Sequence, residues 1–143
     1  MAAYDVVFID DEPSLAEIFQ HYVLWKYRNW RFLTFTNAVA AYREIIFGDL
    51  QSAVWIIDLM MPGKNGTQIA EAIRARHGEA PVLLAYTALD RQVLSSQEQY
   101  RSGMRFFNQV INKREEMAAL LSLVDVWVEN KVGQGDSGTD QKM

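Results

Sequence analysis

One apolar stretch that stops at a single carboxylate constrains this chain more than any other part of its sequence. Residues 54–57 are continuously apolar, and Asp58 ends the run. Continuous apolar runs are typical of a strand buried on both faces, as in a parallel sheet. Turn and helix-start residues follow at 62–66, so we expect Asp58 at the carboxyl end of a central strand, where open α/β sheets bind ligands. Seen in isolation, an aspartate there more commonly forms a turn or caps a helix.

The rest of the chain alternates apolar runs with helical periodicity. Apolar runs at 6–9, 31–36, 54–57, 82–86 and 105–112 predict five strands. Apolar residues at helical spacing predict five helices, of which the fourth covers the more polar segment 90–102. This alternation is the pattern of a doubly wound α/β domain with a five-stranded parallel sheet and five flanking helices.

Composition limits the domain organisation and the classes of site. A chain of 143 residues that is 50% hydrophobic can bury a sizeable core, and we assign residues 1–131 to one domain. The polar residues 132–143 are expected to form a disordered tail or the stub of a linker. The chain contains no cysteine, which excludes disulfides, thiolate catalysis and cysteine-based metal sites.

Charge and hydropathy favour a cytoplasmic protein. Acidic residues begin at Asp5, too early for a signal peptide, and no apolar run approaches the roughly 18 residues of a membrane span. We therefore expect no membrane partner. The net charge of -4 also argues against direct binding to nucleic acid.

Polar residues follow four of the predicted strands. Asp10 and Asp11 follow the first, Asp58 the third, Thr87 the fourth and Lys113 the fifth. Since the carboxyl ends of parallel strands share one edge, these side chains should meet there. Three carboxylates at one place need a cation among them, and Mg²⁺ prefers such oxygen ligands. One hydroxyl and one lysine beside a metal are suited to holding a phosphoryl group.

Four segments of the sequence together resemble the receiver domain of two-component response regulators. The resemblance covers about residues 4–130 and implies a flavodoxin-like or CheY-like fold with strand order 2-1-3-4-5. The segments are Phe8-Ile9-Asp10-Asp11-Glu12, residues 58–66 (Asp-Leu-Met-Met-Pro-Gly-Lys-Asn-Gly), Tyr86-Thr87-Ala88 and Lys113.

The resemblance also implies a role for each matching residue. Asp58 would accept a phosphoryl group from a phosphohistidine on a sensor histidine kinase or a histidine phosphotransfer protein. Thr87 and Lys113 would hold the phosphoryl oxygens. Met60 and Leu89 would border the path of the hydrolytic water. The implied ligands of Mg²⁺ are Asp11, Asp58 and the Met60 carbonyl directly, and Asp10 through water.

The implied output is a change in binding to a downstream effector protein or effector domain. Such a phosphoacceptor module signals by conformational change. At most it catalyses its own phosphorylation and dephosphorylation, and we do not expect it to be an enzyme that acts on a separate substrate.

The fifth strand departs from the family pattern at two positions. Family members usually follow the lysine with a proline in a cis peptide, whereas Arg114 follows Lys113 here. A cis bond before a non-proline residue costs roughly 3–4 kcal/mol, which favours a trans peptide. The family often carries an aromatic switch residue three positions before the lysine, where this chain has Val110.

Two other functions remain open on the sequence. The first is a pseudo-receiver, a protein-interaction domain that works without phosphorylation, and the unusual fifth strand favours it. The second is a small Mg²⁺-dependent phosphohydrolase with an aspartyl-phosphate intermediate. Such enzymes commonly place a second acid two residues after the nucleophile, where this chain has Met60, a side chain that cannot transfer protons.

Overall fold

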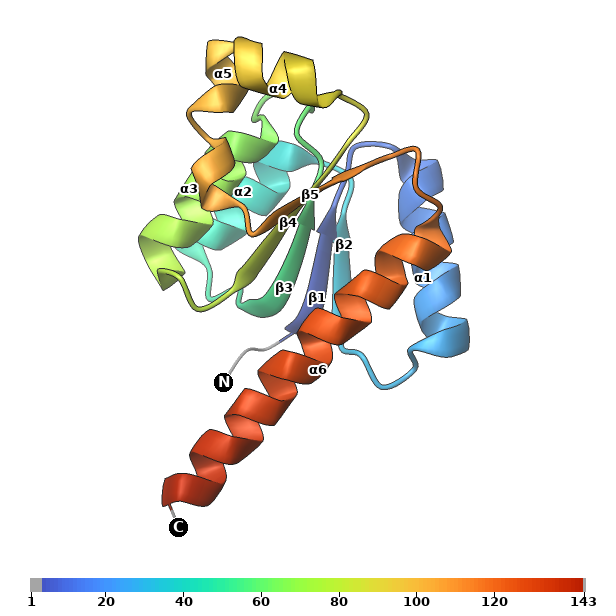
Figure 1. Cartoon of the computed structure of the whole chain (residues 1–143), viewed down its shortest axis with the longest axis vertical. Helices are drawn as coiled ribbons and strands as arrows, with labels where there is room; N and C mark the ends of the chain where they lie inside the picture. Colours follow the sequence, from blue (N-terminus) through green and yellow to red (C-terminus); the bar gives the residue numbers. More distant parts are fainter. Residues whose placement is uncertain (1–3, 143) are drawn as a thin grey trace.

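In the computed structural model, five parallel strands form one sheet in the order β2-β1-β3-β4-β5 (Figure 1). The structure describes residues 4–142, with side chains as far as Lys131. The sheet order confirms the doubly wound fold class. The strands are β1 (Tyr4–Ile9), β2 (Phe32–Phe35), β3 (Ser52–Ile57), β4 (Val82–Thr87) and β5 (Gln109–Asn112).

The three central strands are buried on both faces. Phe8 of β1 lies in register with Ile56 of β3, which in turn lies in register with Leu84 of β4. Alternate residues of one strand enter different cores, with Phe8 on one face of the sheet and Ile9 on the other. This arrangement explains why these strands have continuous apolar sequences.

Helices cover both faces of the sheet (Figure 1). Helices α1 (Pro13–Lys26) and α6 (Met117–Lys142) pack on one face, and α2 (Ala38–Phe47) and α3 (Gly66–His77) pack on the other. At the start of α3, the side chain of Asn65 accepts a hydrogen bond from Gln68 N while Gln68 Oε1 accepts one from Asn65 N. This reciprocal cap explains how the polar turn after β3 starts a helix.

The segment 90–102 differs from the single helix that its sequence predicts. It contains two short helices, α4 (Arg91–Ser96) and α5 (Glu98–Arg101), because Gln97 between them is extended, with φ -94° and ψ 125°. Leu94 of α4 and Tyr100 of α5 are both buried in one small cluster with Leu59 and Ala85. Residues 4–142 therefore form six α-helices, one more than expected.

The fifth strand is shorter than the predicted run of residues 105–112. Met104–Phe106 form a 3-10 turn, η1, and β5 begins only at Gln109. Asn108 Oδ1 accepts hydrogen bonds from Leu83 N and from Arg74 Nη2, both at 2.8 Å. These bonds hold the chain in an irregular path before the strand begins. β2 is also one residue shorter at each end than the predicted run 31–36.

The sequence predicts that the domain ends at residue 131, whereas α6 extends to Lys142. Side chains after Lys131 lie outside the described part of the chain. The division into a receiver domain (1–131) and a disordered tail or linker stub (132–143) therefore stays a prediction. No helix within residues 4–142 is both long enough and apolar enough to cross a membrane.

Candidate functional site

The strand ends along one edge of the sheet bring together the polar residues that the sequence indicates. Asp10 directly follows β1, Asp58 follows β3, Thr87 ends β4 and Lys113 follows β5. Backbone bonds fix this arrangement, since Asp58 N donates to the Ile9 carbonyl (2.9 Å) and Lys113 N donates to the Thr87 carbonyl (2.8 Å). The parallel sheet thus places residues from the two ends of the chain at one edge.

Three carboxylates form the centre of this edge. Asp10, Asp11 and Asp58 each offer an oxygen, and these atoms lie within 4.8 Å of one another. Asp10 and Asp58 are buried, whereas Asp11 is half-buried. A set of hard oxygen donors that is partly open to solvent fits Mg²⁺, which takes oxygen ligands and keeps several waters.

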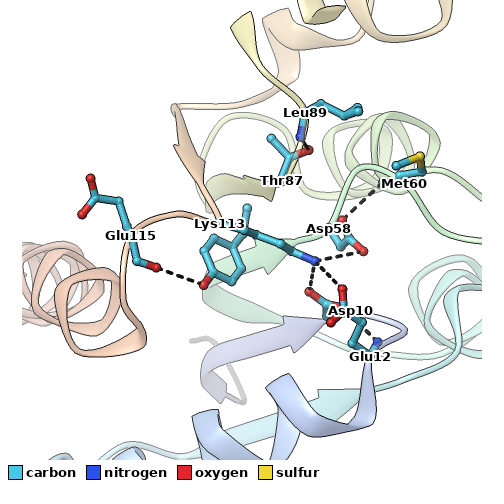
Figure 2. A network of polar contacts seen from close by, with 9 residues as sticks. Asp10, Glu12, Asp58, Met60, Thr87, Leu89, Lys113 and Glu115 are labelled. Carbon is cyan, nitrogen blue, oxygen red and sulfur yellow. Dashed lines mark hydrogen bonds and ion pairs between the residues drawn. The ribbon is translucent and has the colours of Figure 1, made fainter.

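The ammonium group of Lys113 points into this cluster (Figure 2). Its Nζ lies 2.8 Å from Asp10 Oδ2, 3.5 Å from Asp58 Oδ2 and 3.5 Å from Glu12 Oε1. The Lys113 side chain is only 13% exposed, so its ion pairs with the buried Asp10 and Asp58 are weakly screened by water. Lys113 therefore neutralises part of the negative charge at the site.

Burial and crowding change the acidity of Asp58. Burial, followed by the neighbouring negative charge of Asp10, raises the pKa of Asp58 to about 7, although Lys113 and the Met60 N–H oppose the shift. Near neutral pH, without a further cation, a large share of Asp58 is therefore protonated. A second positive charge at the cluster would favour the ionised, nucleophilic form.

The ion pair between Asp10 and Lys113 keeps the lysine charged. Burial raises the pKa of Asp10, and the contact with Lys113 opposes this change. Burial alone would lower the pKa of Lys113, but the contact with Asp10 and the charge of Asp58 raise it above its ordinary value. Lys113 is thus a permanent cation beside the two buried acids.

Thr87 has a hydroxyl proton available for a ligand. Its side chain is buried, and Thr87 Oγ1 accepts a hydrogen bond from Leu89 N at 3.0 Å. Since the oxygen acts as the acceptor, the hydroxyl hydrogen is available to donate. On the other side of the site, Met60 N donates to Asp58 Oδ1 (3.3 Å), and the Met60 side chain is exposed. The predicted roles of the Met60 carbonyl and of the Leu89 side chain stay predictions.

Two residues contact Lys113 that sequence reasoning did not include in the site. Glu12 is the third carboxylate in contact with Lys113, after Asp10 and Asp58. Its position directly after the acid pair in the sequence is the one signal that points to the site. The ring of Tyr86 lies under the lysine, with Nζ 5.7 Å from the ring centre. Tyr86 lies next to Thr87 in β4, but its sequence position indicated only a strand residue.

Comparison with known proteins identifies the family. The model of the response regulator receiver domain matches residues 6–125. The chain belongs to this family. Receiver domains are signalling domains, and the response regulators that contain them act in concert with histidine kinases and effectors.

Individual relatives of this receiver domain are distant in sequence. It is 25% identical over 81 residues to the transcriptional regulatory protein CssR of Bacillus subtilis (strain 168). That match covers 57% of this chain and 34% of CssR. The chain therefore spans about a third of the length of this relative.

Solved receiver structures share the fold. The receiver domain of the Francisella response regulator 1452 is 18% identical, with a TM-score of 0.68 over 89% of this chain and 98% of that chain. TrrA from Thermotoga maritima, solved in complex with Mg²⁺-BeF, is 20% identical, with a TM-score of 0.65 over 89% of this chain and 99% of that chain. At these identities the similarity establishes the fold alone.

Proposed function

We propose that this receiver domain accepts a phosphoryl group on Asp58 and signals through the resulting conformational change. The observation that carries the proposal is the position of Lys113 Nζ, which contacts both buried carboxylates, Asp10 and Asp58, at the carboxyl edge of the sheet. A nucleophilic carboxylate beside a fixed cation is the arrangement that phosphoryl transfer requires, because catalysis there is mainly positioning and neutralisation of charge.

The acid cluster is the proposed Mg²⁺ site. Asp11, Asp58 and the Met60 carbonyl would be direct ligands, and Asp10 would act through water. When bound, Mg²⁺ supplies positive charge that keeps Asp58 ionised and neutralises the oxygens of the incoming phosphoryl group. The oxygen-only donor set within 4.8 Å supports this assignment.

In the proposed transfer, one oxygen of Asp58 forms a bond to phosphorus as the bond between phosphorus and the donor histidine nitrogen breaks. The electron pair of that bond stays on the imidazole of the donor. Lys113 Nζ and the hydroxyl of Thr87 hold phosphoryl oxygens that gain negative charge. The domain's own residues thus position the phosphoryl group and stabilise its negative charge. The phosphorus–nitrogen bond that breaks belongs to the donor.

The proposed partners are a protein that donates the phosphoryl group and a protein that responds to the phosphorylated domain. The donor is a sensor histidine kinase or a histidine phosphotransfer protein, since these carry phosphohistidine. The output partner is a downstream effector protein or effector domain whose binding changes on phosphorylation. We place both interactions in the cytoplasm.

Phosphorylation by a small donor tests the proposal. We expect acetyl phosphate with Mg²⁺ to add one phosphoryl group to the wild-type chain, measured by intact mass, and peptide mapping should locate it at Asp58. Asp58→Asn should abolish the modification. Asp49→Asn should not, because Asp49 is an exposed acid outside the site. A wild type that stays unmodified, or an Asp58→Asn variant that is modified equally, would contradict the phosphoacceptor proposal.

One observation favours a second candidate, a pseudo-receiver that binds partners without phosphorylation. The fifth strand departs from the family pattern, since the partly exposed Val110 stands where the family often carries its aromatic switch residue. Under this alternative the wild type stays unmodified in the acetyl phosphate experiment, and Asp58→Asn leaves partner binding unchanged.

A further inference from the structure

The turn that carries Lys113 is held by the side chain of its neighbour, Asn112. Asn112 is the last residue of β5 and lies in register with Thr87 at the end of β4. The next peptide continues this pairing, since Lys113 N donates to the Thr87 carbonyl at 2.8 Å. Within the described residues every peptide bond is trans, including the one before Arg114. Hydrogen bonds of Asn112 shape this turn.

Three hydrogen bonds of Asn112 stabilise the turn and attach it to a second loop. Its Oδ1 accepts from Arg114 N at 2.9 Å, and its carbonyl accepts from Glu115 N at 3.0 Å. These two bonds, one to the side chain and one to the backbone of Asn112, close the turn around Lys113, and the side-chain bond is of a kind that asparagine commonly makes. Its Nδ2 donates to the Leu89 carbonyl at 3.4 Å, so the same side chain attaches the turn to the loop after β4.

The bond to Leu89 also reaches the hydroxyl of Thr87. Leu89 N donates to Thr87 Oγ1, while the Leu89 carbonyl accepts from Asn112. One residue of the β4–α4 loop therefore contacts both Thr87 and the turn that carries Lys113. Hydrogen bonds through Leu89 and Asn112 thereby connect the hydroxyl of Thr87 to the backbone turn that carries Lys113.

We propose that Asn112 is a positioning residue for phosphoryl transfer, which holds Lys113 over Asp58 and connects it to the Thr87 loop. This inference rests on the proposed function. Without the Asn112 amide, the turn loses the acceptor for Arg114 N and the tie to Leu89. The Lys113 ammonium then spends less time at the carboxylates, and a small misplacement of a catalytic cation slows transfer strongly.

A double-mutant cycle tests whether Asn112 acts through Lys113. We expect Asn112→Ala to slow acetyl phosphate–driven phosphorylation about tenfold, equivalent to about 1.4 kcal/mol. In a Lys113→Ala background, the same change should slow the reaction less than about twofold, because the group that Asn112 positions is already absent. Asn112→Ser, whose hydroxyl can close the turn more weakly, should recover part of the rate. Gln109→Ala, at the exposed start of the same strand, is the control and should leave the rate unchanged.

A spectroscopic measurement tests the position of Lys113 without phosphorylation. In the unmodified wild type, nuclear Overhauser effects should connect the Lys113 ε-methylene group to the Tyr86 ring, and Asn112→Ala should weaken or remove them. The inference would be overturned if these nuclear Overhauser effects persist in Asn112→Ala. It would also be overturned if Asn112→Ala slows phosphorylation equally in the wild-type and Lys113→Ala backgrounds. If the wild type is never phosphorylated, the proposed function fails, and the ring contact still decides the role of Asn112. Should Asn112→Ala fail to fold, Asn112→Ser serves for both measurements.

Discussion

At the scale of single residues, two apolar side chains are predicted to set the lifetime of the phosphorylated state. Met60 lies two positions beyond Asp58, and Leu89 lies two positions beyond Thr87. Met60 is 56% exposed and Leu89 is half-buried. Neither side chain can orient water by hydrogen bonding. Hydrolysis needs a water in line with the bond between phosphorus and Asp58, so its positioning is part of the barrier.

Polar residues at these positions should therefore shorten the lifetime. Met60→Asn combined with Leu89→Glu should accelerate dephosphorylation about tenfold, the effect of one well-placed hydrogen bond of about 1.4 kcal/mol. The measurement is the decay of radiolabelled phosphoryl-protein after removal of the donor. Met60→Leu combined with Leu89→Met is the matched apolar control and should decay like the wild type. Equal decay of the polar variant and the wild type would show that another step sets the lifetime.

At the scale of elements, the segment after β4 is held unevenly. Its far end is fixed by α3, where Arg74 Nε donates to the Phe106 carbonyl (3.0 Å) and Gly103 packs so closely on Thr67 that a Cβ would lie 2.4 Å from it. Helix α4 has six residues and only one of them, Leu94, is buried. Weakly anchored elements are the ones that shift at low cost in free energy.

We therefore expect the conformational output to centre on α4. On addition of beryllofluoride and Mg²⁺, amide hydrogen exchange should change most in Arg91–Ser96 and less in α5 and η1, which α3 holds in place. Val110, which is 42% exposed on β5, replaces the family's aromatic switch and should contribute little. Asp58→Asn is the control and should show no change. A response confined to α3, with α4 silent, would contradict this assignment.

At the scale of the whole molecule, the charge of Asp58 should lower the stability of the fold when no metal is present. The folded-state pKa of Asp58 is raised from 3.8 to about 7. The folded domain thus binds this proton more tightly than the unfolded chain does, so the free energy of unfolding should fall as the pH rises between these two values. Above pH 7 the full destabilisation remains, at most about 4 kcal/mol by the usual conversion of a pKa shift into free energy.

Urea unfolding in chelator should detect this effect. Asp58→Asn should be more stable than the wild type at pH 8, and its advantage should shrink toward pH 4 as Asp58 becomes protonated in the wild type. Mg²⁺ should raise the midpoint of the wild type and leave that of Asp58→Asn nearly unchanged. Asp49→Asn should behave like the wild type. A clear loss of stability in Asp58→Asn at pH 8 in chelator would show that Asp58 has a structural role instead.

The sequence by itself determined the sheet and the composition of its polar edge. Continuous apolar runs predicted the central strands, because a strand covered by helices on both faces has no solvent side to keep polar. Parallel strands share one carboxyl edge, so the positions of Asp10, Asp58, Thr87 and Lys113 at the carboxyl ends of four of the five strands were sufficient to predict their common location. These inferences hold because an apolar run shows which strands are buried, and the alternation of strands with helices indicates that the strands are parallel.

Only the tertiary structure decided how the last third of the domain is arranged. In the segment 90–102, which is split at Gln97, the Gln99 carbonyl accepts a hydrogen bond from the distant Thr67 Oγ1. Before the late start of β5, Asn108 is bonded to Arg74 and Leu83, which also lie far away in sequence. The same holds for the roles of Tyr86 and Asn112 beside Lys113, since a ring below an ammonium group and a hydrogen bond between two loops exist only after the strands pair. Such contacts leave no periodic pattern in the sequence, because one side chain that meets a distant backbone atom is enough to make them.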